Sequence, residues 1–254
     1  MRIASLGSGS RGNGTLIEDA DTCILVDAGF TLKETERRLR KLNRLPTDLS
    51  AVLVTHEHGD HINGVGTFAR KYRIPVYLTP GTYNPRKIGT VPFLEQFNCH
   101  RSFALGSFHI EPVPVPHDAQ EPCQYVIASK GTRVGLLTDI GHITPHVQKQ
   151  YQSCDALLLE CNHDVQMLAR GPYPAALKNR VGGSHGHLNN EQAAELVRGL
   201  DHGRLRHLVL SHISEKNNTA ALAVGAMQSV LPDWPGELHV ASQDEGVYWV
   251  DLDS

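Results

Sequence analysis

The chain has 254 residues, with 24 Lys and Arg against 27 Asp and Glu and a formal net charge of -3. This balance excludes attraction of nucleic acid by overall charge and leaves only local basic patches for that purpose. The five cysteines form no CxxC pair, which argues against a disulfide framework and a cysteine zinc knuckle. Because the sequence shows no signal-peptide pattern and no long apolar run, we expect a soluble, cytoplasmic protein without membrane association.

Short apolar runs typical of strands recur along the whole chain. They cover residues 2–6, 15–19, 23–27, 51–55, 75–79, 108–115, 124–129, 133–139, 156–160, 207–212, 237–242 and 246–250. Helical patterns cover 31–43, 189–200 and 218–231. The first opens with the capping box Thr31 and Glu34, the second is expected to stop at Gly203, and the third stops before Pro232. The Pro-rich stretch 111–122 is expected to be a rigid loop.

The order of these elements is hairpin-like strands followed by strands mixed with helices, twice over. This order favours two mixed sheets packed face to face with helices on the outer faces, an α/β sandwich, over a doubly wound parallel sheet. No linker, fixed repeat or low-complexity tract interrupts the sequence. We therefore expect a single domain over residues 1–254.

The segment His-Glu-His-Gly-Asp-His, residues 56–61, directly follows the apolar run 51–55. In an extended segment His56 and His58 project to the same side and can share one metal ion. Gly59 allows a sharp turn, after which Asp60 and His61 point elsewhere. Asp60 could instead be a simple helix N-cap, and a lone HxH is often only surface. The complete pattern after a strand favours a metal site.

Four residues are too few to bind two ions. Three further candidates, His117, Asp139 and His212, each follow an apolar run. Taken singly they could be a loop residue, a turn former and a strand cap. Their shared position at strand ends, where α/β proteins form ligand crevices, favours a common site.

Together these residues resemble the metallo-β-lactamase fold hydrolases, and the resemblance extends over the whole chain. It implies a four-layer αββα sandwich with a dinuclear centre of Zn or Mn, or of Fe, along one edge. The implied ligands are His56, His58 and His117 for one ion and Asp60, His61 and His212 for the other, with Asp139 bridging. Such a pair of ions can hold a shared hydroxide as nucleophile.

Other motifs narrow the choice within this superfamily. Asp60 and Asp139 stand where zinc β-lactamases have thiolate ligands, and the additional domains or arms of glyoxalase II, ribonuclease Z and β-CASP nucleases have no counterpart here. The segments 8–17, 159–164, 184–196 and 210–218 are most similar to the YycJ/WalJ-like branch, with the PhnP-like phosphodiesterases next. His142 and Asn189 depart from the pattern of that branch. The resemblance implies a phosphodiesterase, and it favours a DNA exonuclease, with nucleic acid as the substrate that the protein binds.

Two alternatives stay open: a hydrolase of small phosphodiesters, thioesters or lactones, and a noncatalytic metal-binding scaffold. A homodimer is also open.

Phosphodiester hydrolysis calls for a group that protonates the departing oxygen. We expect His187 to be this group or to contact the phosphate, and we expect Asp60 to be a catalytic residue as well. Alternatively, His187 only packs against the helix that follows. His163 could line the pocket or support it, and Glu160 could support it as well.

The glycine-rich stretch 7–14 lacks the GK[ST] ending of a P-loop and reads as a tight turn between strands. On the family resemblance it lies at the rim of the site, where Asn13 could touch substrate. The basic residues at 37–44 are more typical of a solvated helix face than of a nucleic-acid surface.

Overall fold

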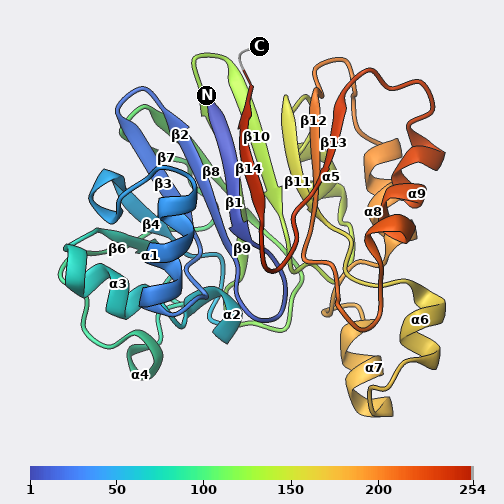
Figure 1. Ribbon diagram of the computed structural model, residues 1–254, viewed down its shortest axis with the longest axis horizontal. Helices are drawn as coiled ribbons and strands as arrows, with labels where there is room; N and C mark the ends of the chain where they lie inside the picture. The colour runs from blue at the N-terminus through green and yellow to red at the C-terminus, as the bar shows by residue number, and fades with distance from the viewer. Residues whose placement is uncertain (253–254) are drawn as a thin grey trace.

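The computed structural model describes residues 1–252, which form two seven-stranded sheets packed face to face (Figure 1). The strand order is β14-β1-β2-β3-β4-β5-β6 in the first sheet and β13-β12-β11-β10-β9-β8-β7 in the second. No helix among the described residues is long and apolar enough to cross a membrane. That residues 1–254 form a single domain stays a prediction.

Each sheet begins with antiparallel strands and continues with parallel ones. In the first sheet β14, β1, β2 and β3 are antiparallel neighbours, and β3 to β6 are parallel. Its strands are β1 (Arg2–Gly7), β2 (Gly14–Asp19), β3 (Thr22–Val26), β4 (Ala51–Leu53), β5 (Val76–Leu78), β6 (Leu94–Gln96) and β14 (Val247–Asp251).

The second sheet repeats this pattern, with β7 to β10 antiparallel and β10 to β13 parallel. Its strands are β7 (Phe103–Leu105), β8 (Phe108–Pro114), β9 (Cys123–Ser129), β10 (Thr132–Leu137), β11 (Ala156–Glu160), β12 (His207–Ser211) and β13 (Glu237–Val240). The repetition predicted from the order of elements is therefore confirmed, and the crossovers between the parallel strands carry the helices.

Helices cover the outer face of both sheets, as Figure 1 shows on its left and right sides. The first sheet carries α1 (Leu32–Lys41) and α3 (Val65–Tyr72), and the second carries α5 (Pro145–Gln150), α8 (Asn190–Arg198) and α9 (Ala220–Val230). The shorter elements are α2 (Gly59–Ile62), α4 (Pro85–Ile88), α6 (Val165–Arg170), α7 (Ala175–Val181) and a 3-10 turn (Pro46–Asp48).

Three apolar clusters correspond to the three interfaces between these layers. One lies between the first sheet and its helices, and includes Leu39 and Phe68. Another lies between the two sheets and includes Ile24 and Val209. The last joins the second sheet to α8 and α9, with Leu210 and Met227 among its members. These layers confirm the predicted αββα sandwich.

Helix starts agree with the sequence better than helix ends. Thr31 caps α1 by accepting a hydrogen bond from the backbone N–H of Glu34 at 3.4 Å. The prediction that the second helix stops at Gly203 is wrong, because α8 ends at Arg198 with Gly199 as its C-cap. The N–H of Gly199 donates to the carbonyl of Glu195, which closes the last turn.

The Pro-rich stretch is a strand in its first part and not wholly a loop. Pro112 and Pro114 belong to β8 and pair with Tyr125 and Cys123 of β9. On the other side β7 pairs only with Phe108–Ile110, so the rest of β8 is an edge, where the missing proline N–H groups cost no ladder hydrogen bond.

The basic face of α1 is also not uniformly solvated. Arg38 is buried, and its guanidinium donates to the carbonyls of Leu6 at 2.5 Å and Gln243 at 3.0 Å while lying over the ring of Phe30. It joins α1 to the end of β1 and to the turn before β14, so this residue serves the packing of these segments rather than a partner.

Candidate metal centre

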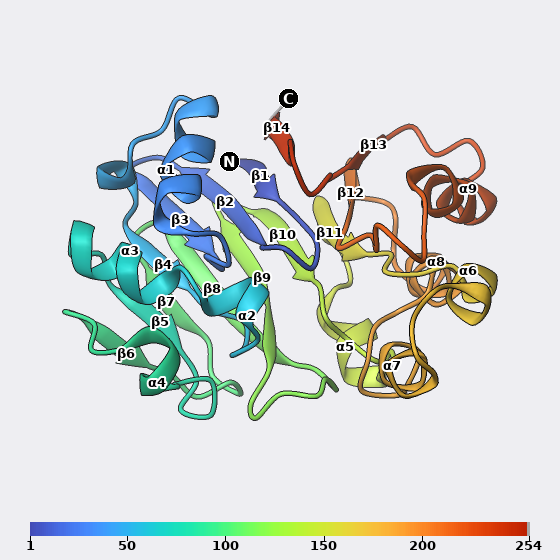
Figure 2. The ribbon, with the colours of Figure 1, turned by 60° about the horizontal axis from the view of Figure 1, so that its bottom comes forward.

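The predicted ligands meet along one edge of the sandwich, which Figure 2 turns toward the viewer with α2 near its centre. His56 lies just after β4, and Asp139 and His212 directly or almost directly follow β10 and β12. His117 follows β8, which runs parallel to β10 because each is antiparallel to β9. The carboxyl ends of these strands therefore bring residues together that are far apart in the sequence.

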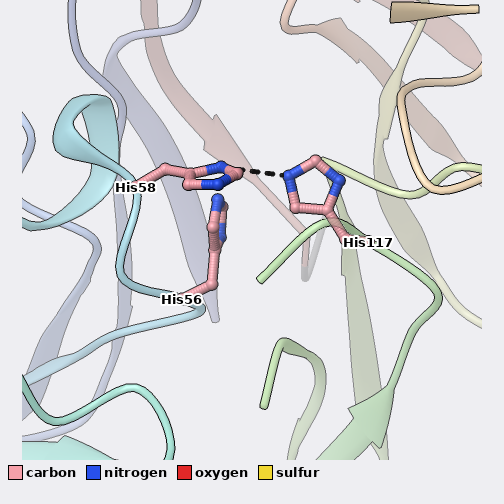
Figure 3. Close-up of side chains that lie close together, drawn as sticks. All are labelled: His56, His58 and His117. Atoms are coloured by element: carbon pink, nitrogen blue, oxygen red, sulfur yellow. Dashed lines mark hydrogen bonds between the residues drawn. The ribbon is translucent and has the colours of Figure 1, made fainter. Parts of the chain in front are cut away.

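The first cluster consists of His56, His58 and His117, whose rings converge in Figure 3. Nε2 of His117 lies 3.2 Å from Nδ1 of His58, and the ring centroid of His56 lies 4.6 Å from that of His58. One ligand nitrogen from each ring lies within 4.8 Å of the others. This spacing suits three imidazoles bound to one ion, because nitrogens at about 2.0–2.1 Å from a tetrahedral zinc are about 3.3 Å apart.

The second cluster consists of Asp60, His61 and His212. Oδ2 of Asp60 lies 3.5 Å from Nε2 of His61 and 3.7 Å from Nε2 of His212. Asp60 and His61 belong to the short helix α2, which begins at Gly59, so the chain turns between the ligands of the two clusters. His56 and His58 thus belong to one cluster and Asp60 and His61 to the other, although the rings of His56 and His61 also lie close, with centroids 4.2 Å apart.

Asp139 lies between the clusters. Its Oδ2 is 3.1 Å from Nε2 of His61 and 2.9 Å from Nδ1 of His212, whereas its Oδ1 is 3.9 Å from Nε2 of His117. One carboxylate oxygen therefore faces the second cluster and the other faces the first. This is the disposition expected of a bridging carboxylate.

The backbone at three strand ends is held in the left-handed region, where non-glycine residues are uncommon. The φ angle is 62° at Asp27 after β3, 53° at Asp139 and 50° at His212. Residues in such conformations persist only when their surroundings hold them, and they gather at functional sites. The strain here turns each side chain from the end of its strand into the centre.

The side-chain nitrogen and oxygen atoms of the candidate ligands are suited to binding cations. Nε2 of His56 is buried and has no hydrogen-bond partner within residues 1–252, and the buried atoms Oδ2 of Asp139 and Nδ1 of His212 face each other at 2.9 Å without the geometry of a hydrogen bond. Buried polar atoms without partners are costly, and a bound ion would satisfy all three. Burial lowers the pKa of His61, but the charges of Asp139, Asp60 and Asp27 outweigh it and raise that pKa well above its ordinary value. The carboxylates therefore favour positive charge at this point, which divalent ions would supply.

Two residues that support the ligands escaped the sequence analysis. Asp27 accepts a hydrogen bond from Nδ1 of His61 at 2.7 Å and from the backbone N–H of Thr55 at 2.9 Å. The hydroxyl of Thr55 lies 2.8 Å from Asp27 and 3.0 Å from Nδ1 of His56. Such partners orient ligating imidazoles and tune their affinity for metal. The available signal was the position of Asp27 at the end of an apolar run, the same signal that selected Asp139.

One glycine permits the close approach of chain segments behind the centre. A Cβ at Gly29 would lie 1.7 Å from the carbonyl oxygen of Asp60, so no other residue fits without moving the loop that carries Asp60 and His61.

Asn13 lies beneath the centre and is nearly fully buried. Its Nδ2 lies 3.1 Å from Nε2 of His61 and 3.3 Å from Oδ2 of Asp60, while its Oδ1 accepts from the backbone N–H of Gly9. From the same glycine-rich turn it is Ser10 that lines the cavity. The contact of Asn13 with substrate stays a prediction, and the bonds seen here join the turn to the ligands.

His163 is buried as well, and burial lowers its pKa to about 4. Its carbonyl accepts a hydrogen bond from the N–H of Asn190 at the start of α8. It does not line the cavity beside the ligands, so its role in binding substrate also stays a prediction.

His187 stands between the clusters. Its ring centroid lies 5.3 Å from that of His117 and 5.2 Å from that of His212. Nδ1 donates to Oε2 of the fully buried Glu160 at 3.1 Å and lies 3.4 Å from Oδ1 of Asp139. Burial lowers the pKa of His187, but the charge and hydrogen bond of Glu160 and the charge of Asp139 raise it to about 9. The ring is therefore held protonated at neutral pH in the metal-free chain.

A cavity of about 360 Å³ opens over the ligands. Besides His58, Asp60, Asp139, His187 and His212, its lining includes residues of the segment leading into α7 and of α7 itself, namely Tyr173, Leu177, Arg180 and Val181. Nε of Arg180 donates to Oδ2 of Asp118 at 2.5 Å, and Oδ1 of Asp118 lies 3.4 Å from Nε2 of His117. A cation thus lies at the mouth of the cavity, held there by a carboxylate. The sequence analysis singled out neither Arg180 nor Asp118.

Comparison with known proteins shows to which family the chain belongs. The family model described as beta-lactamase superfamily domain matches residues 22–213. The exodeoxyribonuclease YycJ of Bacillus anthracis is 35% identical over 237 residues, which cover 92% of this chain and 90% of that protein. The exodeoxyribonuclease WalJ of Streptococcus pneumoniae is 38% identical over 238 residues, 91% of this chain and 88% of that protein.

A solved structure of a diphosphatase from the PhnP family has the same fold. It superimposes with a TM-score of 0.65 at 18% identity and covers 98% of this chain and 97% of its own. The resemblance to the YycJ/WalJ-like branch is confirmed, and the PhnP-family structure shares the fold. With its two sheets, its convergent histidines and carboxylates and these relatives, the chain belongs to the beta-lactamase superfamily and is a metal-dependent hydrolase.

Proposed function

We propose that the chain is a phosphodiesterase with a dinuclear metal centre, and that its substrate is DNA, which it degrades as an exonuclease. The observation that carries the dinuclear proposal is the position of Asp139, whose two oxygens face different members of two adjoining three-residue clusters. The proposed ligands are His56, His58 and His117 for one ion and Asp60, His61 and His212 for the other. The DNA substrate is supported by relatives named exodeoxyribonucleases that match over nine tenths of the chain.

Two divalent ions bound here would supply Lewis-acid stabilisation of the phosphate charge and an activated water. The chemistry of the chain's own residues centres on His187. In the metal-free chain the charges of Glu160 and Asp139 raise the pKa of His187 to about 9, and the ring lines the cavity between the clusters. His187 can therefore donate a proton to the oxygen that departs from phosphorus, which is the role that we assign to it. Asp60 lines the same cavity, and its carboxylate lies 3.5 Å from Nε2 of His61 in the second cluster.

The rim of the cavity has groups suited to a nucleotide chain. Arg180 offers a planar guanidinium of the kind that binds phosphate bidentately. Tyr173 lines the same cavity, and Nζ of Lys216 lies 5.8 Å from the centre of its ring. Aromatic faces beside cations bind single-stranded nucleic acid by stacking and by charge. Such a rim accounts for nucleic-acid binding by a chain with no overall positive charge.

The test is a substrate panel with the zinc-loaded and manganese-loaded protein. It compares end-labelled single- and double-stranded DNA with a chromogenic phosphodiester and a thioester. We expect release of nucleotides from DNA ends that disappears in Asp139→Asn. Turnover of the small phosphodiester alone would replace DNA by a small substrate, thioester turnover alone would overturn the phosphodiesterase proposal, and no turnover would favour a metal-binding scaffold.

The metal stoichiometry is measured on the same preparations. Close to two ions per chain at the centre are expected, whereas a single ion that is lost completely in His56→Ala would overturn the dinuclear proposal.

A further inference from the structure

A second group of metal-ligating side chains lies away from the catalytic edge, on the neighbouring strands β12 and β13. It consists of His207, Glu237 and His239, which each offer one ligand atom within 4.8 Å of the others. In the parallel register His207 stands opposite Glu237 and Val209 stands opposite His239. Since side chains alternate along a strand, all three project from the same face as Val209.

This cluster is separate from the centre described above. His207 is the first residue of β12, and His212 follows the last. Five residues of extended chain span about 16 Å, so the two sites lie at opposite ends of the same strand. None of the three residues lines the catalytic cavity.

The separations between these side-chain atoms are longer than most hydrogen bonds and close to those of atoms that bind one ion together. Oε2 of Glu237 lies 3.7 Å from Nδ1 of His207 and 3.4 Å from Nε2 of His239. Ligand atoms at about 2.0–2.2 Å from a tetrahedral zinc ion are about 3.3–3.6 Å apart, so these separations already match two edges of such a site.

The second observation is that the nitrogens facing the cluster have no partner. Nδ1 of His207 and Nε2 of His239 are both buried atoms without a hydrogen bond among residues 1–252. The side chain of His207 is only 9% exposed, whereas that of Glu237 is 68% exposed. The cluster therefore combines two buried, unsatisfied imidazole nitrogens with a carboxylate that opens to solvent, from which an ion and a water ligand can enter.

We propose that His207, Glu237 and His239 bind one divalent transition-metal ion of the zinc type, with water as the fourth ligand. Two imidazoles and one carboxylate are a donor set that zinc uses in proteins. Because β13 is the edge strand of its sheet and pairs through only four residues, Glu237–Val240, the ion would fasten this strand to β12. The role assigned to the site is thus structural, and it does not depend on the reaction at the catalytic edge.

The experiment counts zinc per chain after equilibrium dialysis of the full-length protein against buffered Zn²⁺. It compares wild type with His239→Gln and Glu237→Gln. The exposed histidine His146, on α5, provides the matched control His146→Gln. The expected result is a loss of one zinc per chain in both cluster variants and none in the control. All of these proteins keep the same ligands at the catalytic centre. The difference in zinc content between wild type and variant therefore reports on His207, Glu237 and His239 whatever number of ions the catalytic centre binds.

A second readout is the thermal midpoint with and without zinc. Saturation of a site at about 100 times its Kd raises the Tm of a chain of this size by about 5–10 °C. We expect the zinc-dependent rise to be larger by this amount in wild type than in Glu237→Gln, whose exposed side chain can change without disturbing the fold. Equal zinc content in wild type and both variants, or equal zinc-dependent rises in Tm, would overturn the proposal.

Discussion

The substitution Glu160→Gln tests how the chain holds the proton that we assign to catalysis. Oε1 of Glu160 accepts from the backbone N–H groups of Ile140 and Leu188, both at 2.9 Å. Oε2 accepts from the N–H of Asp139 at 3.0 Å and from Nδ1 of His187 at 3.1 Å. A glutamine has the same shape but replaces one oxygen by an NH₂ group, which cannot accept. Two of the four hydrogen bonds are therefore lost whichever way the amide turns.

The raised pKa of His187 and the hydrogen bonds of Glu160 indicate how large the effect of Glu160→Gln should be. Raising the pKa of His187 from 6.5 to about 9 corresponds to about 3 kcal/mol in favour of the protonated ring. Burial opposes this rise, and Glu160 is the first of the groups that outweigh it. Without the charge and hydrogen bond of Glu160, burial is opposed only by the charges of Asp139 and Asp60, and the pKa of His187 should fall. The two lost hydrogen bonds to a carboxylate add a destabilisation of about 3–6 kcal/mol.

The sign of the pH dependence follows from the raised pKa. A histidine whose pKa is higher in the folded than in the unfolded state stabilises the fold fully below pH 6.5. This contribution is lost as the pH rises through about 9. The metal-free wild type should therefore lose stability between these two values, and Glu160→Gln should lack this decline.

The assay is an NMR titration of the histidine rings in metal-free protein, with His187→Gln to identify the resonance. Urea unfolding at pH 6 and pH 9.5 measures the accompanying stability. Glu215→Gln, which changes an exposed carboxylate, is the control. A His187 resonance that titrates at the same pH in wild type and in Glu160→Gln would refute the reasoning, because Glu160 would then not hold the proton.

Three further predictions concern the centre. Asp139→Asn removes the charge shared by both clusters, so metal analysis should show loss of metal from both, and retention of both ions would contradict the bridging position. Asp27→Asn weakens the bond that orients His61 and should lower metal affinity about 10–100-fold in a chelator competition; an unchanged affinity would make Asp27 purely structural. Arg180→Ala should raise the KM for DNA about 10–100-fold with little change in kcat. The control Arg170→Ala changes a residue outside the cavity lining and should leave KM and kcat unchanged. Equal effects of the two substitutions would show that Arg180 does not bind substrate.

Much of the fold follows from local sequence. Alternating or continuous apolar runs mark strands because each strand must bury at least one face, and the order of runs and helices indicates the repeated sandwich. Short strands such as β4 and β5 are predicted because they are buried apolar runs, whereas β6 and β7, equally short, include exposed residues and form no such run. The Pro-rich β8 was assigned in part to a loop because its sequence does not show that β7 stops early.

The sequence by itself determined the ligand chemistry: a strand followed by His-x-His-x-Asp-His, and single His or Asp residues after other strands. These are local patterns, and the carboxyl ends of parallel strands lie at the same edge of a sheet whatever the length of the loops between them. Only the tertiary structure decided which neighbours complete the centre. Asp27 meets His61 across 34 positions of sequence, and Glu160 meets His187 across 27. Asn13 turns inward under the ligands, and Arg180 reaches the cavity from α7. Such contacts depend on how packed layers place loops of different length, which no residue pattern within a single element encodes.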